Sequence, residues 1–350
     1  MGAGASKEAK FPTGDKLKVE IAKILDIRFE TGSGQISGDK TLVESIKLQV
    51  PNKYRSNKSL DLHLDTCWRI RDAMPLTASI DNFVDIHRGN EEVELCSKLA
   101  IVRAILGAER ESNLWLDGTR NDSRINFGLI EKTWFNKFFC CLSENCSAEQ
   151  LPERLKTVKL IIFNYDRCVE HYLYQVLQTC YCVRPHQAVE LLQNIEIFHP
   201  YGKVGHLPWE KNNASVAFGE DIMASRLLEL AVQIKTFAEG TDPNSSDVSD
   251  IRNVLNEARI IIFLGFAFHP INLKFLTSTG VSIPKTKKFC LATAHDISSS
   301  DCEIIKDDLK KLIGEGLASP IIRNDLKCYE LFQQYGRSLR FTKKLSSMAP

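Results

Sequence analysis

The sequence predicts an α/β protein in which a parallel sheet carries an inserted helical module. Three observations support this class. A glycine-rich segment, Gly2-Ala3-Gly4-Ala5-Ser6, opens the chain, and the apolar periodicity of residues 36–150 is helical. Polar residues or glycine also follow three later apolar runs, in Phe163-Asn164-Tyr165-Asp166, His199-Pro200-Tyr201-Gly202 and Phe263-Leu264-Gly265-Phe266. The carboxyl ends of parallel strands line one crevice, so these segments are expected to meet at a dinucleotide site.

The first expected helix follows Pro12-Thr13-Gly14, because apolar residues recur at helical spacing over residues 16–27. A turn that leads into a helix presents backbone N–H groups to phosphate, and glycine lets the backbone come close. Residues 3–6 with Pro12 and Thr13 are therefore the expected pyrophosphate contacts. A strand is expected before such a turn, but only Met1 precedes Gly2.

The next part of the chain reads as a helical module. Amphipathic helices are expected over residues 41–50, 60–73, 79–87, 91–106 and 129–142, and strand-like alternation is scarce there. The predicted domains are a core formed by residues 1–35 and 151–350, and a module formed by residues 36–150.

The α/β pattern then resumes. Strands are expected over residues 158–163, 195–198 and 259–264, with residues 288–293 as the last core strand. Helices are expected over residues 167–179, 222–237, 248–258, 300–313 and 325–335.

Composition narrows the class of protein. The 350 residues carry 45 Lys and Arg against 44 Asp and Glu, so bulk charge offers no support for direct nucleic-acid binding. No apolar run approaches the ~20 residues that cross a bilayer, and no secretory signal is visible, so a cytoplasmic protein without membrane contact is expected. The 11 cysteines include no C-x-x-C pair, which favours reduced thiols and argues against a zinc site.

Asn164, Asp166 and His199 are the candidate catalytic residues, because each directly follows an expected strand. Asn164 and Asp166 could instead form a turn and cap the next helix, and Asp166 could do both. An imidazole titrates near pH ~6.5, so His199 could act as a general base. His206 and His269 are its two rivals.

Two further residues have an open interpretation. Gly265 either permits close approach to a ribose or phosphate or forms a tight strand exit. Asn272 either bonds an adenosine or caps the helix that follows.

These blocks together resemble the sirtuin-like NAD-binding family, and more closely its bacterial antiphage-defence branch. The resemblance rests on GAGAS at residues 2–6, FNYD at 163–166 and HPYG at 199–202, and it extends in order over most of the chain. It implies a Rossmann-like, sirtuin-like core. The four-cysteine zinc ribbon of the deacylases is absent, and Phe163 stands where they have Gln, so protein deacylation is not expected. Lys10 stands where the defence branch often has glycine.

The resemblance implies hydrolysis of NAD+ to nicotinamide and ADP-ribose, as the NAD-depleting effector of a defence system. Asn164 would hold the nicotinamide ribose and a water, His199 would act as base, and Asp166 would orient hydroxyls. The remaining expected cofactor contacts are Ala3, Gly4, Ala5, Ser6, Pro12, Thr13, Tyr165, Gly265, Phe266, Asn272 and Thr293.

Other functions stay open from the sequence. The chain could sense NAD or an ADP-ribose derivative without consuming it, transfer ADP-ribose or an acyl group, or act as a scaffold. The resemblance further implies a homo-oligomer and a partner chain such as a HerA-type ATPase or a short Argonaute.

Overall fold

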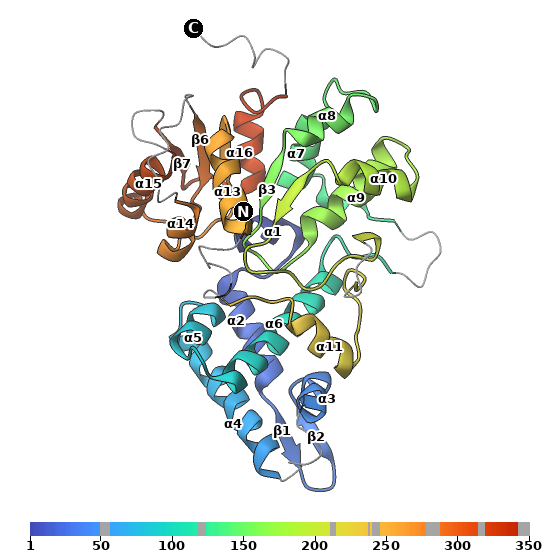
Figure 1. Cartoon of the computed structure of the whole chain (residues 1–350), viewed down its shortest axis with the longest axis vertical. Coiled ribbons are helices and arrows are strands. Elements are labelled where there is room, and N and C mark those ends of the chain that lie inside the picture. The colour runs from blue at the N-terminus through green and yellow to red at the C-terminus, as the bar shows by residue number, and fades with distance from the viewer. Residues whose placement is uncertain are drawn as a thin grey trace.

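Two groups of elements occupy opposite ends of the molecule (Figure 1). The computed structural model describes residues 1–49, 57–117, 124–210, 215–236, 239, 246–277, 288–313 and 319–341. The parallel strands and their helices fill one end. A bundle of helices with a short hairpin fills the other, and both ends contribute to the site described below.

All strands of the first end run parallel to their neighbours. β3 (Lys159–Ile161) pairs with β4 (Glu196–Phe198), and β5 (Ile260–Phe263) pairs with β6 (Phe289–Thr293), which pairs in turn with β7 (Ile321–Arg323). These strands are short and rich in β-branched and aromatic residues, which suit a buried pleated surface. The parallel strands with their helices confirm the α/β class.

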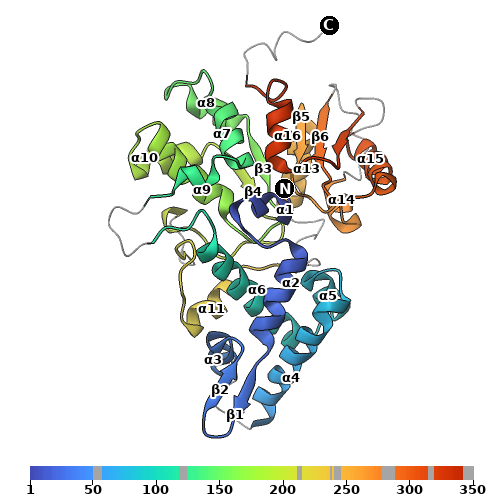
Figure 2. The ribbon, with the colours of Figure 1, turned by 180° about the vertical axis from the view of Figure 1, so that it is seen from behind.

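The first two residues of the chain join the two parallel sheets. The Met1 nitrogen donates to Ile161 O at 2.6 Å, and Phe163 N–H donates to Met1 O at 3.0 Å. On the other side, Gly2 N–H donates to Leu264 O at 3.0 Å. This backbone therefore takes the place of a strand between β3 and β5. As a result, the carboxyl ends of both sheets face one region (Figure 2).

Helices pack around these strands. They are α1 (Ala3–Ser6), α7 (Trp134–Ser143), α8 (Leu151–Lys156), α9 (Cys168–Cys180), α10 (Pro185–Leu192), α13 (Ser246–Glu257), α14 (Pro270–Leu276), α15 (Ser299–Ile313) and α16 (Cys328–Tyr335). Glu8 fixes the N-terminal segment to two of them, because its carboxylate accepts from Trp134 N–H at the start of α7 and from Tyr329 N–H at the start of α16.

The helical end consists of α2 (Gly14–Leu25), α3 (Lys40–Gln49), α4 (Asn57–Ala73), α5 (Ile80–Ile86), α6 (Glu91–Glu111) and α11 (Ala224–Ala231). α2 packs on α4 and α6, and α11 packs on α3 and α6. The hairpin of β1 (Arg28–Glu30) and β2 (Gly34–Ser37) lies at the tip of this end. The division of the chain into a core and a module stays a prediction.

Most expected elements are present, including the helix after Thr13 and the four expected strands. The expectation that residues 288–293 form the last strand is wrong, because β7 follows. β7 has three residues, all half-buried, and this is too short for an alternation of apolar and polar side chains to be recognised in the sequence. The β1–β2 hairpin was also not expected, since its strands are mostly exposed and lack an apolar face. No helix within the described residues is long and apolar enough to cross a membrane.

Candidate functional site

The backbone of Gly4 and Gly265 forms one side of the site, and we call this contact the glycine corner. Gly4 N–H donates to Gly265 O at 3.0 Å, and Gly265 N–H donates to the Thr293 hydroxyl at 2.8 Å. Gly265 has φ +51°, and a Cβ on it would lie 2.0 Å from Ala5 N. The close contact of Gly265 is therefore with the chain's own backbone at the exit of β5, and its approach to a ribose or phosphate stays a prediction.

The side chain of Ser6 joins this corner to the segment that follows β3. Its hydroxyl donates to Asp166 Oδ2 at 2.9 Å and accepts from Asn164 Nδ2 at 3.4 Å. Asp166 Oδ1 also accepts from Cys168 N–H at 3.1 Å, at the start of α9. The N-cap of α9 is Arg167, so Asp166 lies one residue before the expected cap position, where it bonds the first N–H of the helix and the Ser6 hydroxyl. Burial raises the pKa of Asp166, and these hydrogen bonds oppose the rise.

His199 reaches the same place from the end of β4. Its Nδ1 lies 3.4 Å from the backbone oxygen of Asn164, and its Nε2 lies 2.8 Å from Glu170 Oε1. Both side chains of the histidine–glutamate pair are almost buried. The structure therefore brings Ser6, Asn164, Asp166 and His199 together from three separate segments.

Glu170 is the residue of this site that the sequence analysis did not single out. It lies in the first turn of α9, four residues after Asp166, and Lys203 Nζ is 3.2 Å from its Oε1. Burial alone would raise the pKa of Glu170, but Lys203 and His199 outweigh burial and hold it well below its usual range. No sequence signal singled out Glu170, because an acidic residue in the first turn of a helix is common.

Three of the expected cofactor contacts are occupied by other side chains. The Tyr165 hydroxyl donates to Asp81 at the start of α5. The Tyr201 hydroxyl donates to Asn272 Oδ1 at 2.5 Å, and the Phe266 ring packs edge-on against Phe163 at 5.1 Å. The Tyr165 contact links the segment after β3 to α5 of the helical end, and the Tyr201 contact links the segment after β4 to α14.

The expectation that Asn272 could cap the following helix is wrong. His269 is the N-cap of α14, and Asn272 lies inside that helix, which begins at Pro270. Proline is favoured in the first turn of a helix because its missing N–H needs no partner there. His269-Pro270 was the signal for this boundary.

Two backbone N–H groups of the N-terminal turn are already hydrogen-bonded within the protein. Gly4 N–H is bonded to Gly265 O, as described above, and Ala5 N–H donates to Gly2 O at 2.9 Å. Thr13 is the N-cap of α2, whose first N–H groups have no carbonyl partner inside the helix. Lys10 has φ +72°, the left-handed conformation in which glycine is usual. In α1, by contrast, the N–H groups of Gly4 and Ala5 are already hydrogen-bonded within the protein.

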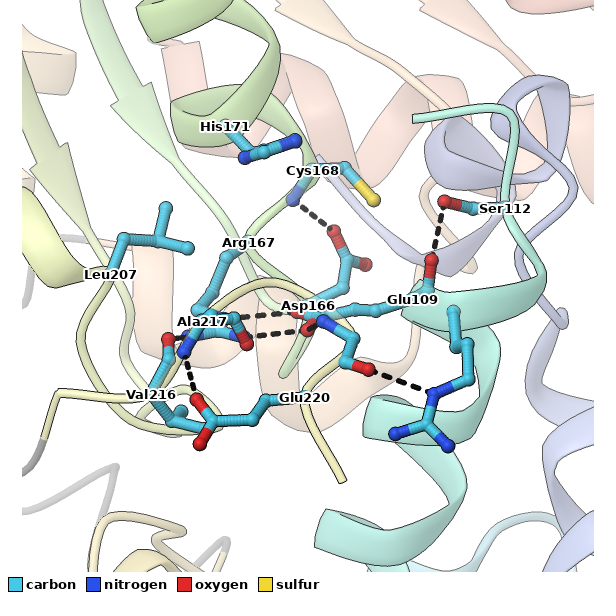
Figure 3. A network of polar contacts seen from close by, with 12 residues as sticks. Glu109, Ser112, Asp166, Arg167, Cys168, His171, Leu207, Val216, Ala217 and Glu220 are labelled. Carbon is cyan, nitrogen blue, oxygen red and sulfur yellow. Dashed lines mark hydrogen bonds and ion pairs between the residues drawn. The ribbon is translucent and has the colours of Figure 1, made fainter. Parts of the chain in front are cut away.

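A buried ion pair of Arg167 and Glu109 lies beside Asp166 (Figure 3). The Arg167 guanidinium bonds both carboxylate oxygens of Glu109 on α6, at 2.9 and 2.5 Å. It also donates to Val216 O at 2.7 Å and Ala217 O at 3.2 Å, while Gly219 N–H donates to Glu109 at 2.8 Å. Both charged side chains are fully buried. The pair fastens the segment that contains Val216 to α6 and α9.

A cavity of about 520 Å³ lies between β4 and α13, away from these residues. Acidic side chains at Glu196, Asp250 and Glu257 line it, and no lysine or arginine is found among the described residues of its lining. Such a lining repels a pyrophosphate, so the cavity is a poor dinucleotide site. Within the described ranges, no three His, Cys, Asp or Glu side chains gather closely enough to hold a metal ion.

Comparison with known proteins adds no relative to this picture. No family model, curated protein or solved structure matches the chain.

Proposed function

We propose that this protein hydrolyses the bond between nicotinamide and ribose in NAD+, releasing nicotinamide and ADP-ribose. The observation that carries the proposal is the meeting of Asn164 and His199 at the ends of two parallel strands, beside Ser6 of the glycine corner. Ligands of open α/β sheets bind at the carboxyl ends of strands. The resemblance of these segments to the sirtuin-like family supports the same assignment.

The reaction needs orientation more than strong acid catalysis, because nicotinamide leaves as a neutral group from a cationic substrate. The C1′–N bond breaks with its electron pair moving to the pyridinium nitrogen, and the ribose passes through an oxocarbenium-like state. A water oxygen then bonds to C1′, and the water proton passes to His199. Asn164 would hold the ribose and the water, since a fixed amide lowers the entropy cost of this geometry.

The remaining residues of the site would support these two. Asp166 would hold Ser6 in place and place negative charge near the developing positive charge on the ribose. The start of α2, with Pro12 and Thr13, and the turn of residues 3–6 would face the pyrophosphate. Gly265, Phe266, Asn272 and Thr293 would border the adenosine half, with Tyr165 below the ribose.

The biological role that we propose is NAD+ depletion by an effector of bacterial antiphage defence, acting in the cytoplasm as a homo-oligomer or beside a partner chain. This role comes from the resemblance. Loss of NAD+ from cells that express the protein during phage infection, and not from cells that express the Asn164→Ala variant, is the result expected.

The chemical test is chromatography of nicotinamide and ADP-ribose after incubation of purified protein with NAD+. The unmodified protein is expected to form both products in equal amounts. Asn164→Ala and His199→Ala are each expected to lower the rate by about 100-fold or more, the usual contribution of a positioned base or donor. His186→Ala is the matched control, because His186 is exposed on α10, and its rate should match that of the unmodified protein.

Thermal unfolding of each variant separates chemistry from folding. An Asn164→Ala protein that melts like the parent and hydrolyses NAD+ at the parental rate would refute the role of Asn164. NAD+ that binds to the parent and stays intact would refute hydrolysis and favour a sensor.

A further inference from the structure

One carboxylate oxygen in the site is shared by a histidine and a lysine. Glu170 Oε1 lies 2.8 Å from His199 Nε2 and 3.2 Å from Lys203 Nζ. The other oxygen, Oε2, is buried and has no hydrogen-bond partner among the described residues. A histidine can lose its charge near neutral pH and a lysine keeps it, so the two partners of Oε1 are not equivalent.

We propose that Glu170, backed by Lys203, is a positioning residue that fixes His199 with its Nε2–H toward the carboxylate and its Nδ1 toward Asn164. The inference rests on the proposed function for its catalytic meaning. The orientation and proton position of His199 can be measured without any catalysis.

The two neighbours of the imidazole decide which nitrogen carries the proton. Glu170 Oε1 and the backbone oxygen of Asn164 are both acceptors, and a neutral imidazole has a single N–H to give. The carboxylate is charged and nearer, at 2.8 Å against 3.4 Å, so it takes that N–H. Nδ1 then keeps its lone pair on the Asn164 side, where a water proton would be accepted.

Protonation of His199 completes this arrangement. The imidazolium has two N–H groups, so Nε2 continues to donate to Glu170 while Nδ1 donates to the Asn164 oxygen. Both acceptors are satisfied only in this form.

Lys203 keeps the carboxylate negative when His199 is neutral. Burial favours the protonated form of Glu170, so a carboxylate left alone with a neutral imidazole would compete for the proton. Lys203, in the segment after β4, supplies a permanent charge on the same oxygen. The other charged or titratable groups near this pair are Asp166, Arg167 and His171 from the start of α9, and His206 and Glu210 from the loop that follows Lys203.

The test is nuclear magnetic resonance of protein labelled with ¹³C and ¹⁵N at its eight histidines, with His199→Gln to assign the signal. Nitrogen shifts report which ring nitrogen carries the proton. We expect the neutral ring to be protonated at Nε2. Glu170→Gln should lower the titration midpoint of His199 by about one pH unit, because it removes an opposite charge. Lys203→Met should raise that midpoint, because it leaves the carboxylate uncompensated.

Opposite shifts from two neighbouring substitutions are a result that loosened packing alone does not produce. Glu153→Gln is the matched control, because Glu153 pairs with Lys156 at an exposed site and the His199 midpoint should not move. A neutral ring protonated at Nδ1, or shifts of the same sign in the two variants, would overturn the inference.

The rate of NAD+ hydrolysis against pH gives the second readout. Its acid limb should move down in pH with Glu170→Gln and up with Lys203→Met, following the two midpoints, since a base acts only when unprotonated. Expected midpoint shifts in a protein that leaves NAD+ intact would support the positioning of His199 and refute the proposed function. Hydrolysis with unmoved midpoints would do the reverse.

Discussion

Two ionic clusters at the start of α9 use the same kinds of group in opposite ways. In the Glu109–Arg167 cluster, both carboxylate oxygens bond the guanidinium, and backbone groups take up further bonds on each side. In the cluster of Glu170, His199 and Lys203, one carboxylate oxygen bonds both the imidazole and the ammonium group, and the other has no partner among the described residues. One turn of helix separates the two.

The difference indicates what each cluster does. A buried network whose hydrogen bonds are satisfied holds one structure, because any rearrangement exposes an unpaired charge to a low-dielectric interior. A cluster with spare acceptor capacity and a titratable imidazole can gain or lose a proton at small structural cost. We therefore infer that the Glu109–Arg167 cluster holds the segments around the site in place. The cluster of Glu170, His199 and Lys203 would take part in proton transfer.

The largest expected effect comes from breaking the first cluster. Arg167→Ala leaves Glu109 charged and buried without its partner, and we expect it to lower the free energy of unfolding by about 3–5 kcal/mol. Urea unfolding followed by circular dichroism measures the loss. The double change Arg167→Met with Glu109→Leu should recover part of it, because apolar side chains need no counter-charge. The recovery is incomplete because Val216 O, Ala217 O and Gly219 N–H each lose a hydrogen-bond partner. A single variant as stable as the parent would contradict the role given to this pair.

The sequence predicted the residues of the candidate site better than it predicted the Glu109–Arg167 ion pair beside them. Asn164, Asp166 and His199 could be selected because each follows an apolar run directly, and a strand end fixes where the next side chain lies. Arg167 and Glu109 could not be paired, since they lie 58 residues apart on elements whose packing is decided by tertiary contacts. Glu170 was missed because a carboxylate in the first turn of a helix is ordinary on electrostatic grounds and draws no attention.

The fold divides in the same way. Periodicity predicted the long helices and the buried strands, because their apolar faces are wide enough to show. The hairpin and β7 are short and lack such a face. The joining of the two sheets by Met1 and Gly2 depends on backbone hydrogen bonds alone, which leave no trace in side-chain pattern.

The next effect concerns His171, which follows Glu170 in α9. Burial lowers the pKa of His171 to about 3, and its ring stacks on Phe218 at 4.1 Å. The unfolded chain binds a proton at this residue below pH 6.5 and the folded chain does not, so stability falls as pH falls from 6.5 towards 3. His171 alone should account for a loss of about 3 kcal/mol between pH 6.5 and about pH 4.

Unfolding of the His171→Gln variant across this range measures that contribution, and its curve should be flatter than that of the parent. Glu170 gives the contrasting window. Its pKa is lowered in the folded chain, so its contribution is present above its ordinary pKa of 4.5 and is lost as pH falls below it. Glu170→Gln should flatten the curve below that value. A variant curve as steep as that of the parent below pH 4.5 would contradict this contribution.

A smaller effect is expected where the glycine corner meets the site. Ser6→Ala removes the hydroxyl that bonds Asp166 and Asn164, and we expect a loss of about 1 kcal/mol in the free energy of unfolding. The rate of NAD+ hydrolysis should fall by more than this loss explains, since Asn164 loses a side-chain contact. Ser33→Ala is the control, because Ser33 is exposed in the hairpin turn. Equal effects of the two substitutions would remove Ser6 from the site.

The smallest effect is expected at the outer edge of the second cluster. Glu210 bonds Lys203 at 2.7 Å on the side away from Glu170, and its side chain is 25% exposed against 5% for Glu170. Partly exposed ion pairs are worth less than about 1 kcal/mol, so Glu210→Gln should change the unfolding free energy by no more than that. The amide oxygen of glutamine can still accept from Leu207 N–H, as Glu210 does. A loss in unfolding free energy as large as that of Arg167→Ala would mean that Glu210 is needed to hold Lys203 in place. The Glu170 cluster would then stabilise the fold as the Glu109–Arg167 pair does.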